Sequence, residues 1–432
     1  MTRALTVLGA VDTDDQPVEL RAVDGEVTEV GARVAAQPGD EMLHAGGDVL
    51  LRGLVNGHTH AAMTLFRGYG GDLPLMEWLE DRIWPAEARL TADDVYWGTR
   101  LACIEMLRGG TTEFWDMYWH PTAVARAVRD AGMRATVGPP LIDGLDPSRA
   151  ASVCADAGAL LDEIVDVSPR VRACLAPHGI YTASDATLAW VAEQSATRDL
   201  PVQLHFLETA DEVTGCLDRY GERPGALLER VGLLSERLVL SHAVYVEREE
   251  IDRLATYGVT VVTNPVSNLK LAVGQLFPWT ALRAAGVAIG IGTDGAASNN
   301  SLDLLADLKV AALLQKFADD DPAALPAREA WALATGALAP RLRSADARSV
   351  VDGTESGTTP EVGEPADFFL ARRDAPELTP GHVLDNLVYA GGRSVVRTTV
   401  VGGVVLVRDG VIDGEDEVRA KVIECARRLG VL

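Results

Sequence analysis

The chain has 432 residues, with 63 acidic against 39 basic side chains, a formal net charge of −24 and an ordinary 47% of hydrophobic residues. This length can hold a large core and more than one domain. The strong negative charge disfavours binding to nucleic-acid phosphate or to an anionic membrane. No apolar run reaches the roughly 18 residues of a membrane span, and the first residues are expected to form a β-strand rather than a signal peptide.

The five cysteines are scattered along the chain without close pairing. An odd number of cysteines without ligand spacing favours reduced, buried thiols and disfavours a cysteine metal site. We therefore expect a cytoplasmic protein whose chemistry is carried by other residue types.

The two ends of the chain have the pattern of short strands joined by tight turns. Asp24-Gly25 is a typical hairpin signal within residues 1 to about 50. Residues 366–370 and 395–407 are also predicted strands, and residues 415–429 are a predicted helix that ends at Gly430. We expect the ends to pair into a small β-sandwich domain, residues 1–52 and 363–432, beside a central domain of residues 53–362.

The central region alternates strand-like apolar runs with helical patterns, which predicts an α/β fold of the (β/α)8 TIM-barrel type. The segment 339–362 is predicted to be a loop that returns to the small domain. The eight expected strands lie near 50–57, 112–117, 133–138, 171–177, 202–207, 238–243, 259–264 and 287–293. The expected helices include 91–108, 121–131, 185–198, 222–230, 247–257 and 302–317.

The pair His58-Thr59-His60 stands at the end of the first of these strands. Two histidines at i and i+2 on a strand point to the same face, so both imidazoles can reach one metal ion. Single polar residues end later apolar runs in the same way: His178, His205, His242 and Asp294. In a barrel these positions gather at the carboxyl-terminal rim, where such folds carry their chemistry.

A mononuclear zinc site needs three or four nitrogen or oxygen ligands and an open position. His58, His60, His205 and Asp294 supply that set, although each alone could equally be a hydrogen-bonded core residue. The four lysines all lie at or after Lys270, so no carbamylated lysine can bridge two metals at a middle strand. We expect one metal ion, zinc or alternatively Fe2+ or Mn2+, which the same ligands suit.

Other residues of this rim are candidates for proton transfer. Glu208 lies three residues past His205, within reach of water and substrate, and is predicted to be a proton shuttle rather than a solvated loop carboxylate. His242 is predicted to orient the water or polarise the substrate rather than to be purely structural. Trp78 and Glu87 lie in a long stretch after the first strand that could form a lid, although spacing alone favours plain packing for the tryptophan.

Several segments together resemble the amidohydrolase superfamily, and within it the branch of S-adenosylhomocysteine and 5'-methylthioadenosine deaminases. Triazine hydrolases and aromatic-base deaminases are cousins of that branch. The resemblance covers essentially the whole chain. It rests on the segments Gly57-His58-Thr59-His60, Ala176-Pro177-His178-Gly179, His205-Phe206-Leu207-Glu208, Asn264-Pro265-Val266-Ser267-Asn268 and Gly292-Thr293-Asp294-Gly295.

The resemblance implies a role for each candidate. One zinc would be held by the four ligands named above, Glu208 would protonate a ring nitrogen, and His242 with Asp294 would handle the attacking water. His178, Trp78 and Glu87 would contact a purine nucleoside, with Glu87 suited to ribose hydroxyls. Family members are commonly oligomeric, so a homo-oligomer is expected.

One departure from the family pattern bears on the substrate. Members that bind homocysteine are expected to have an arginine just after the third strand, where it would hold a carboxylate. Pro139 and Pro140 stand there instead, and Arg149 is the candidate replacement. This favours a nucleoside without a carboxylate, such as 5'-methylthioadenosine, 5'-deoxyadenosine or adenosine, over S-adenosylhomocysteine.

The sequence thus predicts a metal-dependent aminohydrolase that removes the 6-amino group of an adenine nucleoside. The first alternative is a deaminase of a free base or pterin, or a triazine hydrolase. The remote alternative is an inactive scaffold of the same fold, which would usually lack a ligand histidine.

Overall fold

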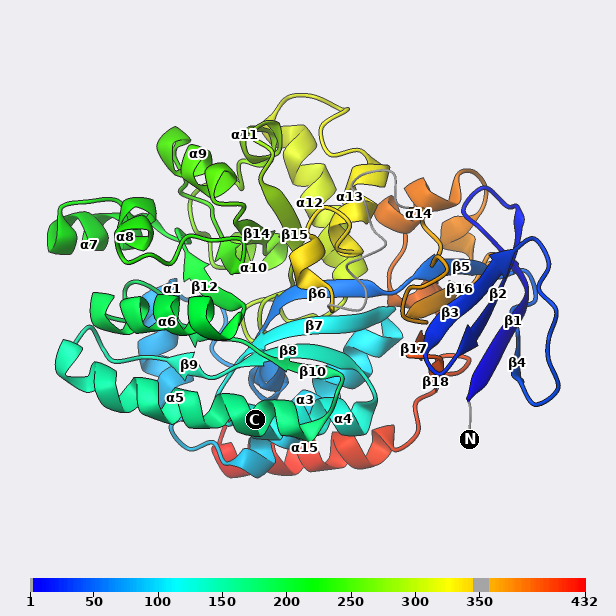
Figure 1. Ribbon diagram of the computed structural model, residues 1–432, viewed down its shortest axis with the longest axis horizontal. Helices are drawn as coiled ribbons and strands as arrows, with labels where there is room; N and C mark the ends of the chain where they lie inside the picture. Colours follow the sequence, from blue (N-terminus) through cyan, green and yellow to red (C-terminus); the bar gives the residue numbers. More distant parts are fainter. Residues whose placement is uncertain (1–2, 345–356) are drawn as a thin grey trace.

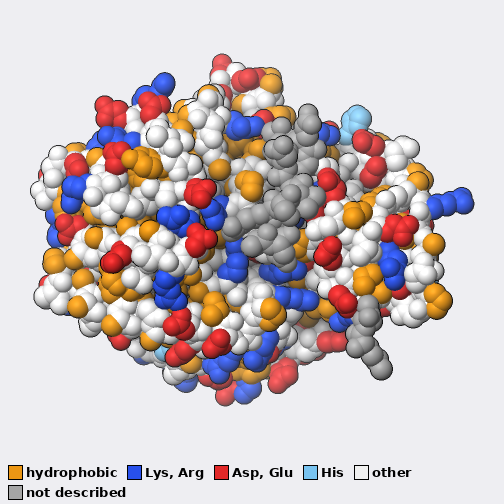
Figure 2. Space-filling view, viewed as in Figure 1, with side chains coloured by type: hydrophobic (Ala, Val, Ile, Leu, Met, Phe, Trp, Pro, Cys, Tyr) orange, Lys and Arg blue, Asp and Glu red, His pale blue; other side chains and the backbone are white. Residues whose placement is uncertain are grey.

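The computed structural model describes residues 3–344 and 357–432, which form a barrel and a smaller β-sheet side by side (Figure 1). The predicted loop 339–362 lies partly outside these residues. In Figure 1 the N-terminal strands (blue) lie beside the C-terminal strands (orange), although more than 300 residues separate them in the sequence. On the face shown in Figure 2, acidic and basic side chains are interspersed rather than gathered into a basic stripe.

Eight parallel strands form the barrel, as predicted. Leu175 bridges to Val202 and so links the two four-stranded parts of the barrel sheet, and the Asp294 N–H donates to the His58 carbonyl at 3.0 Å where the barrel closes. The strands are β6 (Leu54–Thr59), β7 (Thr111–Met117), β8 (Arg134–Gly138), β10 (Val171–Ala173), β12 (Val202–Phe206), β13 (Leu238–His242), β14 (Thr260–Thr263) and β15 (Ala288–Ile291).

Two predicted strands are each divided in the structure. The run 50–57 is shared between β5 (Val49–Arg52), in the small sheet, and β6, in the barrel. Gly53 makes this transition, where a Cβ would lie only 2.2 Å from Thr112 Oγ1, so a side chain has no room. The run 171–177 is divided into β10 and β11 (Ala176–Pro177), which pairs with β9 (Pro140–Leu141).

Helices surround the barrel, and their ends show ordinary capping chemistry. Thr91 and Asp94 form a reciprocal capping box at the start of the predicted helix 91–108. The 21-residue helix over 147–167 is not among the predicted helices, although Asp146-Pro147 is a typical helix start. The helices are α3 (Ala92–Arg108), α4 (Pro121–Ala131), α5 (Pro147–Val167), α6 (Asp185–Arg198), α7 (Ala210–Tyr220), α8 (Pro224–Arg230), α9 (Arg248–Thr256), α10 (Pro265–Lys270), α11 (Trp279–Ala284), α12 (Leu304–Ala318) and α13 (Ala327–Ala334).

The small sheet is built from both ends of the chain, in the order β18-β17-β16-β5-β1-β2-β3, with β4 also paired to β1. Its core holds Leu20 from the N-terminal part and Phe368 from the C-terminal part, both fully buried. The strands are β1 (Ala4–Val11), β2 (Pro17–Val23), β3 (Glu26–Gly31), β4 (Glu41–His44), β16 (Phe368–Ala371), β17 (Val396–Val401) and β18 (Val404–Val407). The two layers of a sandwich, and the boundaries at 52/53 and 362/363, stay predictions.

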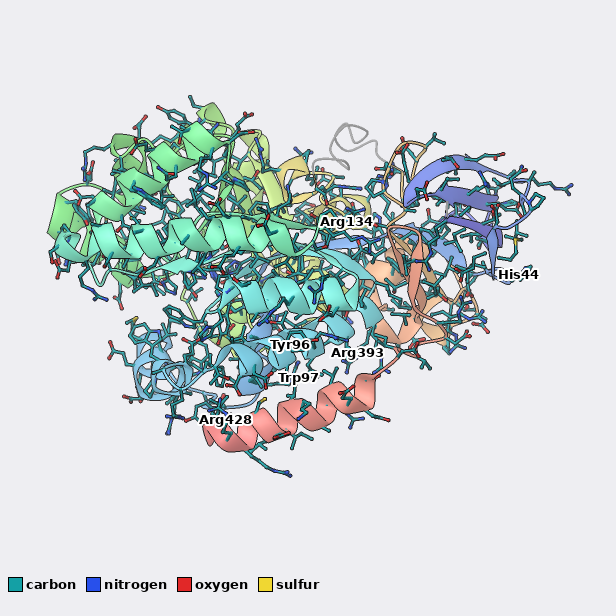
Figure 3. The ribbon with its side chains drawn as sticks, turned by 60° about the horizontal axis from the view of Figure 1, so that its bottom comes forward. His44, Tyr96, Trp97, Arg134, Arg393 and Arg428 are labelled. Carbon is teal, nitrogen blue, oxygen red and sulfur yellow. The ribbon has the colours of Figure 1, made fainter. Side chains whose placement is uncertain are left out.

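The chain ends in the predicted C-terminal helix, α15 (Glu415–Leu429), which packs against α3 (Figure 3). Arg428 forms an ion pair with Asp94 at the start of α3, so this helix joins the end of the chain to the barrel. A short helix, α14 (Val383–Tyr389), packs on α12 and α13. Within residues 3–344 and 357–432, no helix has the length and apolar character needed to cross a membrane.

Candidate active site

The predicted ligands lie together at the carboxyl-terminal ends of the barrel strands. His58 and His205 lie near the ends of the buried strands β6 and β12, and His60 follows β6 directly. Asp294 lies three residues after β15. Because all strands of the barrel are parallel, their ends meet at one rim and bring these side chains within contact distance.

Four ligand atoms converge on one point. His205 Nε2 lies 3.2 Å from both His58 Nε2 and His60 Nε2. Asp294 Oδ1 lies 3.2 Å from His60 Nε2 and 3.5 Å from His58 Nε2. Three imidazole nitrogens and one carboxylate oxygen are the donor types that zinc takes in proteins, so these residues could hold a divalent metal ion.

Hydrogen bonds on the far side of two imidazoles fix their orientation. Nδ1 of His60 donates to the Met117 carbonyl, and Nδ1 of His205 donates to the His178 carbonyl, each at 2.7 Å. Donation from Nδ1 leaves a lone pair on Nε2, which is the tautomer that a metal needs.

Asp294 is held from two sides. Its Oδ2 accepts hydrogen bonds from Ser267 Oγ at 2.6 Å and from Ser298 Oγ at 2.9 Å, which leaves Oδ1 toward the histidines. The residue has a φ of 61°, a left-handed conformation that is uncommon outside glycine and that clusters at functional sites.

The protonation of the site is consistent with a metal. Burial lowers the pKa of His58 to about 4, so its imidazole is neutral at neutral pH. Burial acts on His60 in the same direction, but the hydrogen bond and charge of Asp294, the bond to Met117 and the charge of Asp116 together outweigh it and raise the pKa of His60 to about 9. The proton shared by His60 and Asp294 lies where the ligand atoms converge, and a divalent cation would displace it. The residues present therefore fit a divalent metal ion.

Glu208 and His242 form a second buried group beside the ligands. His242 ends β13 with a φ of 75°, and its Nδ1 donates to Asn268 Oδ1 at 2.8 Å. The same nitrogen lies 3.8 Å from Glu208 Oε1. Burial raises the pKa of Glu208, which favours its protonated form.

A cavity opens above the ligands and encloses about 670 Å³ including its open mouth. Most of the predicted site residues line it: Trp78, Glu87, His178, Glu208, His242 and the ligands His60, His205 and Asp294. His58 lies fully buried beneath. The predicted lid consists of α1 (Leu75–Trp78), a π-helical turn (Leu79–Ile83) and α2 (Trp84–Glu87).

Arg149 is the predicted site residue that does not line this cavity. It is exposed in the first turn of α5. A Cβ at Gly144 would lie 3.2 Å from its Nη1, and Gly144 lines an outer chamber that shares Trp84 and Glu87 with the inner cavity. Its contact with substrate stays a prediction.

Sequence reasoning missed two aromatic residues that hold Glu87. Tyr118 Oη donates to Glu87 Oε1 at 2.7 Å, and Trp119 Nε1 donates to Oε2 at 3.2 Å. Both residues follow β7 directly, so their position at a strand end would have indicated them as site residues in the sequence. Burial raises the pKa of Glu87, and the bond from Tyr118 opposes this.

His178 presents one nitrogen to the cavity. Its Nδ1 lies 3.0 Å from Thr182 Oγ1, and burial lowers its pKa to about 3. The imidazole is therefore neutral at neutral pH and offers one hydrogen bond to a ligand rather than a charge. Of the three remaining histidines, His44 and His382 line neither cavity, whereas His120 lines the outer chamber.

Comparison with known proteins shows to which family this chain belongs. Residues 49–339 match the model of the amidohydrolase family. A 5'-deoxyadenosine deaminase of Methanoregula boonei is 42% identical over 96% of this chain and 92% of its own length. A 5-methylthioadenosine/S-adenosylhomocysteine deaminase of Desulforudis audaxviator is 41% identical over 98% of this chain and 97% of its own length.

A solved structure shares the same fold and more than a third of the sequence. The crystal structure of an adenosine deaminase from Xanthomonas campestris with bound zinc superposes with a TM-score of 0.88. It is 34% identical and covers 99% of this chain and 98% of its own. The likeness extends over the barrel and the small sheet alike.

Proposed function

This chain belongs to the amidohydrolase family, and on that premise we propose that it is a zinc-dependent deaminase of adenine nucleosides. The observation that carries the proposal is the convergence of His58, His60, His205 and Asp294 beneath a cavity that also holds Glu208. The relatives described above are named as deaminases of 5'-deoxyadenosine, of 5-methylthioadenosine and S-adenosylhomocysteine, and of adenosine, and these names support the substrate class.

The cavity favours a nucleoside with a neutral 5'-substituent. Pro140 and Ile142 line it where a carboxylate-binding arginine was expected, and neither offers a cationic group. The shared outer chamber has an apolar wall that includes Met76 and Leu90, which suits a methylthio or deoxy group better than an amino acid. We therefore rank 5'-deoxyadenosine, 5'-methylthioadenosine and adenosine above S-adenosylhomocysteine.

Each residue of the site has a role in this reaction. Zinc, when bound, supplies a Lewis acid that lowers the pKa of water toward about 7. Asp294 accepts the proton of the attacking water, and His242, fixed by Asn268, orients that water toward the carbon bearing the amino group. Glu208, whose pKa burial raises, donates its proton to the adjacent ring nitrogen. The carbon–nitrogen bond then breaks, and the proton taken by Asp294 passes to the amino group, which leaves as ammonia. The second proton of the water restores the acid form of Glu208. Glu87 accepts hydrogen bonds from the ribose.

The proposal is tested with the zinc-loaded enzyme and a panel of adenosine, 5'-deoxyadenosine, 5'-methylthioadenosine, S-adenosylhomocysteine and adenine. The ultraviolet change on conversion of adenine to hypoxanthine gives kcat/KM for each. We expect a strong preference for a neutral nucleoside. If the metal-loaded enzyme deaminated none of the five compounds, the proposal would be overturned.

The first alternative, a deaminase of free bases or pterins or a triazine hydrolase, has the same metal site. The position of Glu87 disfavours this alternative, because a half-buried carboxylate held by two donors would face no hydroxyl in a free base. Equal rates on adenine and adenosine would support that alternative. The inactive-scaffold alternative is disfavoured, because all four ligands converge.

We also propose the finer points of organisation that the sequence predicts. The shared core of Leu20 and Phe368 supports a sandwich built from residues 1–52 and 363–432, beside a catalytic domain of residues 53–362. A homo-oligomer, a cytoplasmic location and the absence of nucleic-acid or membrane partners remain part of this proposal. Size-exclusion chromatography with light scattering tests the oligomer.

A further inference from the structure

Asp307 is a buried carboxyl group that has no role in the proposed reaction. It lies in α12 and is fully buried. Both of its side-chain oxygens lie 3.1 Å from Nδ2 of Asn299, and it also accepts the N–H of Val266. These described partners are neutral donors. Because a carboxyl group buried among neutral groups costs stability, we expect its contacts to have a further use.

The two partners of Asp307 are the sequence neighbours of the two serines that hold Asp294. One partner directly precedes Ser267 in α10, and the other directly follows Ser298 in the loop after β15. Both serine hydroxyls donate to Oδ2 of Asp294, at 2.6 and 2.9 Å. A closed ring of contacts therefore joins the two aspartates, with Asp307 on the side away from the histidines.

The loop arm of this ring also contacts the backbone beside Asp294. Nδ2 of Asn299 donates to the Thr293 carbonyl at 2.8 Å, so the two hydrogens of this amide serve Asp307 and Thr293. Oδ1 of Asn56 accepts the Thr293 N–H at 3.0 Å. The residue before Asp294 is thus held at both of its peptide groups, which supports the left-handed φ of 61° at Asp294.

The other arm fixes the start of the short helix that carries Ser267. The N–H of Val266 lies in the first turn of α10, where a helix supplies no acceptor of its own. The N-cap residue, Asn264, makes no side-chain cap bond. Asp307 accepts this N–H instead, and the dipole at a helix start favours an acidic acceptor. The position of Ser267, one residue further along, therefore depends on α12.

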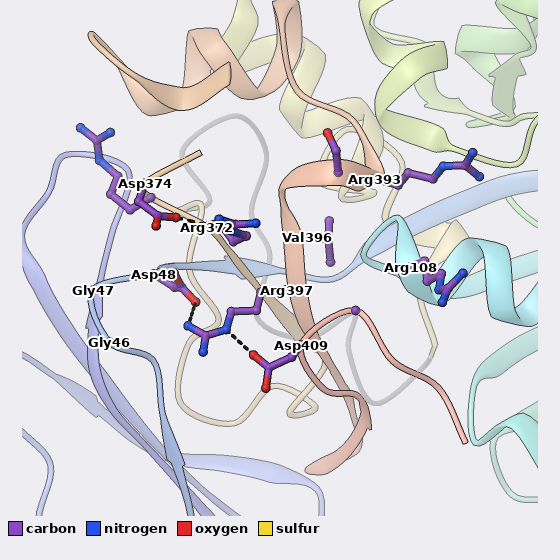
Figure 4. A pocket seen from close by; sticks show the side chains of 13 residues that line it. Gly46, Gly47, Asp48, Arg108, Arg372, Asp374, Arg393, Val396, Arg397 and Asp409 are labelled. Atoms are coloured by element: carbon purple, nitrogen blue, oxygen red, sulfur yellow. Dashed lines mark hydrogen bonds and ion pairs between the residues drawn. The ribbon is translucent and has the colours of Figure 1, made fainter. Parts of the chain in front are cut away.

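The helix that carries Asp307 is itself fixed at its start. Asp303, the N-cap of α12, accepts the Leu305 N–H at 3.2 Å and the Arg393 N–H at 2.9 Å. Arg393 comes from the C-terminal part of the chain and lines the pocket between the small sheet and the barrel (Figure 4). Asp307 lies about one helical turn after this anchor, so its carboxyl group is presented from a fixed helix.

We propose that Asp307 is a positioning residue for the metal site, which acts through α10 and the loop after β15 to hold Asp294 toward the histidines. Two serines on separate segments can bind one carboxylate oxygen only if the segments keep a fixed spacing. Asp307 bonds to both segments and so sets that spacing. The inference rests on the metal site of the proposed function, but not on the identity of the substrate.

The test measures the zinc affinity of Asp307→Asn by competition with a chromogenic chelator. The amide keeps the volume of the carboxyl group, but its NH2 group would face one of the two N–H donors. We expect zinc affinity to fall about tenfold, as for the loss of an outer contact of a metal ligand. Asp156→Asn, on the exposed face of α5, is the matched control and should bind zinc as the parent does.

A second readout and a double-mutant cycle separate positioning from general stability. In the cobalt-substituted protein, the visible absorption bands of Asp307→Asn should shift, because they report the ligand geometry of the folded chain. In an S267A/S298A background, Asp307→Asn should cost little further zinc affinity, so that the losses do not add. An equal loss in both backgrounds, or a zinc affinity and cobalt spectrum like those of the parent, would overturn the proposal.

Asn299→Ala keeps the proposal testable if Asp307→Asn does not fold. It removes the donor of the loop arm, leaves the buried acid in place, and should weaken zinc binding in the same way. Normal zinc affinity in Asn299→Ala would overturn the proposal. If the parent chain bound no zinc, the proposed function would fail together with this inference, whereas a zinc-binding parent with unaffected variants would refute the inference alone.

Discussion

Ser267 Oγ donates a 2.6 Å hydrogen bond to Asp294 Oδ2, and this bond turns the other carboxylate oxygen toward His58 and His60. Ser267 lies in α10, just after β14, whereas Asp294 follows β15. The orientation of a proposed metal ligand therefore depends on a hydroxyl from the neighbouring strand–helix junction. Such outer contacts usually contribute substantially to metal affinity.

Ser267→Ala should weaken metal binding by about tenfold, at the low end of the 10–100-fold cost of losing such a contact. The smaller value is expected because Ser298 still holds Oδ2 at 2.9 Å. Competition for zinc with a chromogenic chelator measures the change. Ser152→Ala, on the exposed face of α5, serves as the control and should leave zinc affinity as it is. If both variants bound zinc with the same affinity, Ser267 would not contribute to metal binding.

Glu208→Gln should retain zinc and the fold but lose turnover by about 10²–10⁴-fold, the usual contribution of a general acid or base. The amide has the shape of the acid, but it has no acidic proton to transfer, whereas burial raises the pKa of Glu208 and so favours its acid form. Steady-state kinetics on the best nucleoside, with zinc content measured on the same sample, tests this. Near-normal turnover would refute the role, whereas loss of zinc would make Glu208 a ligand instead.

The barrel and the ligand set were predictable because each rests on a local pattern. Strand-end positions such as His205 and Asp294 follow apolar runs, and parallel strands bring their ends together whatever the loops do. Glu208 was predictable for the same reason, since it lies three residues past a ligand. The pairing of the two chain ends was also predictable from their similar strand patterns.

The supporting contacts were not predictable, because they depend on distances between segments remote in sequence. Nothing local shows that Tyr118 will meet Glu87, 31 residues earlier, or that Asn268 will accept from His242. Residues 50–57 are divided between two sheets at Gly53, where packing against Thr112 leaves no room for a side chain. This packing cannot be seen in the local sequence. The hydrophobic pattern of such a run predicts a single strand.

Glu87→Gln should reduce kcat/KM on adenine nucleosides by about 10–100-fold, because a hydrogen bond to a charged acceptor contributes roughly 1.5–3 kcal/mol. Activity on free adenine should change little, so the preference for nucleosides falls. The comparison needs kcat/KM on adenosine and adenine for each variant. Glu77→Gln, exposed on the same lid and outside the lining of both cavities, is the matched control. An equal fall on both substrates would show that Glu87 positions the purine or the lid rather than the ribose.

Glu212 is buried and contacts the Glu208 backbone. From its titration we expect a specific dependence of stability on pH. Its Oε2 accepts the Glu208 N–H at 3.0 Å, and its Oε1 has no partner among the described residues. Burial raises its pKa from 4.5 to about 8. Between these two values the folded chain keeps a proton that the unfolded chain releases, so stability falls as pH rises from about 4.5 toward 8.

Glu212→Gln removes this titration while keeping an oxygen for the Glu208 N–H. The melting temperatures of parent and variant should therefore be similar near pH 5, and the variant should become progressively more stable toward pH 8. Thermal unfolding of both zinc-loaded proteins across this range measures the difference, since the titrations of the other groups are common to both. A difference that stays constant with pH would show that Glu212 titrates alike in the folded and unfolded chains.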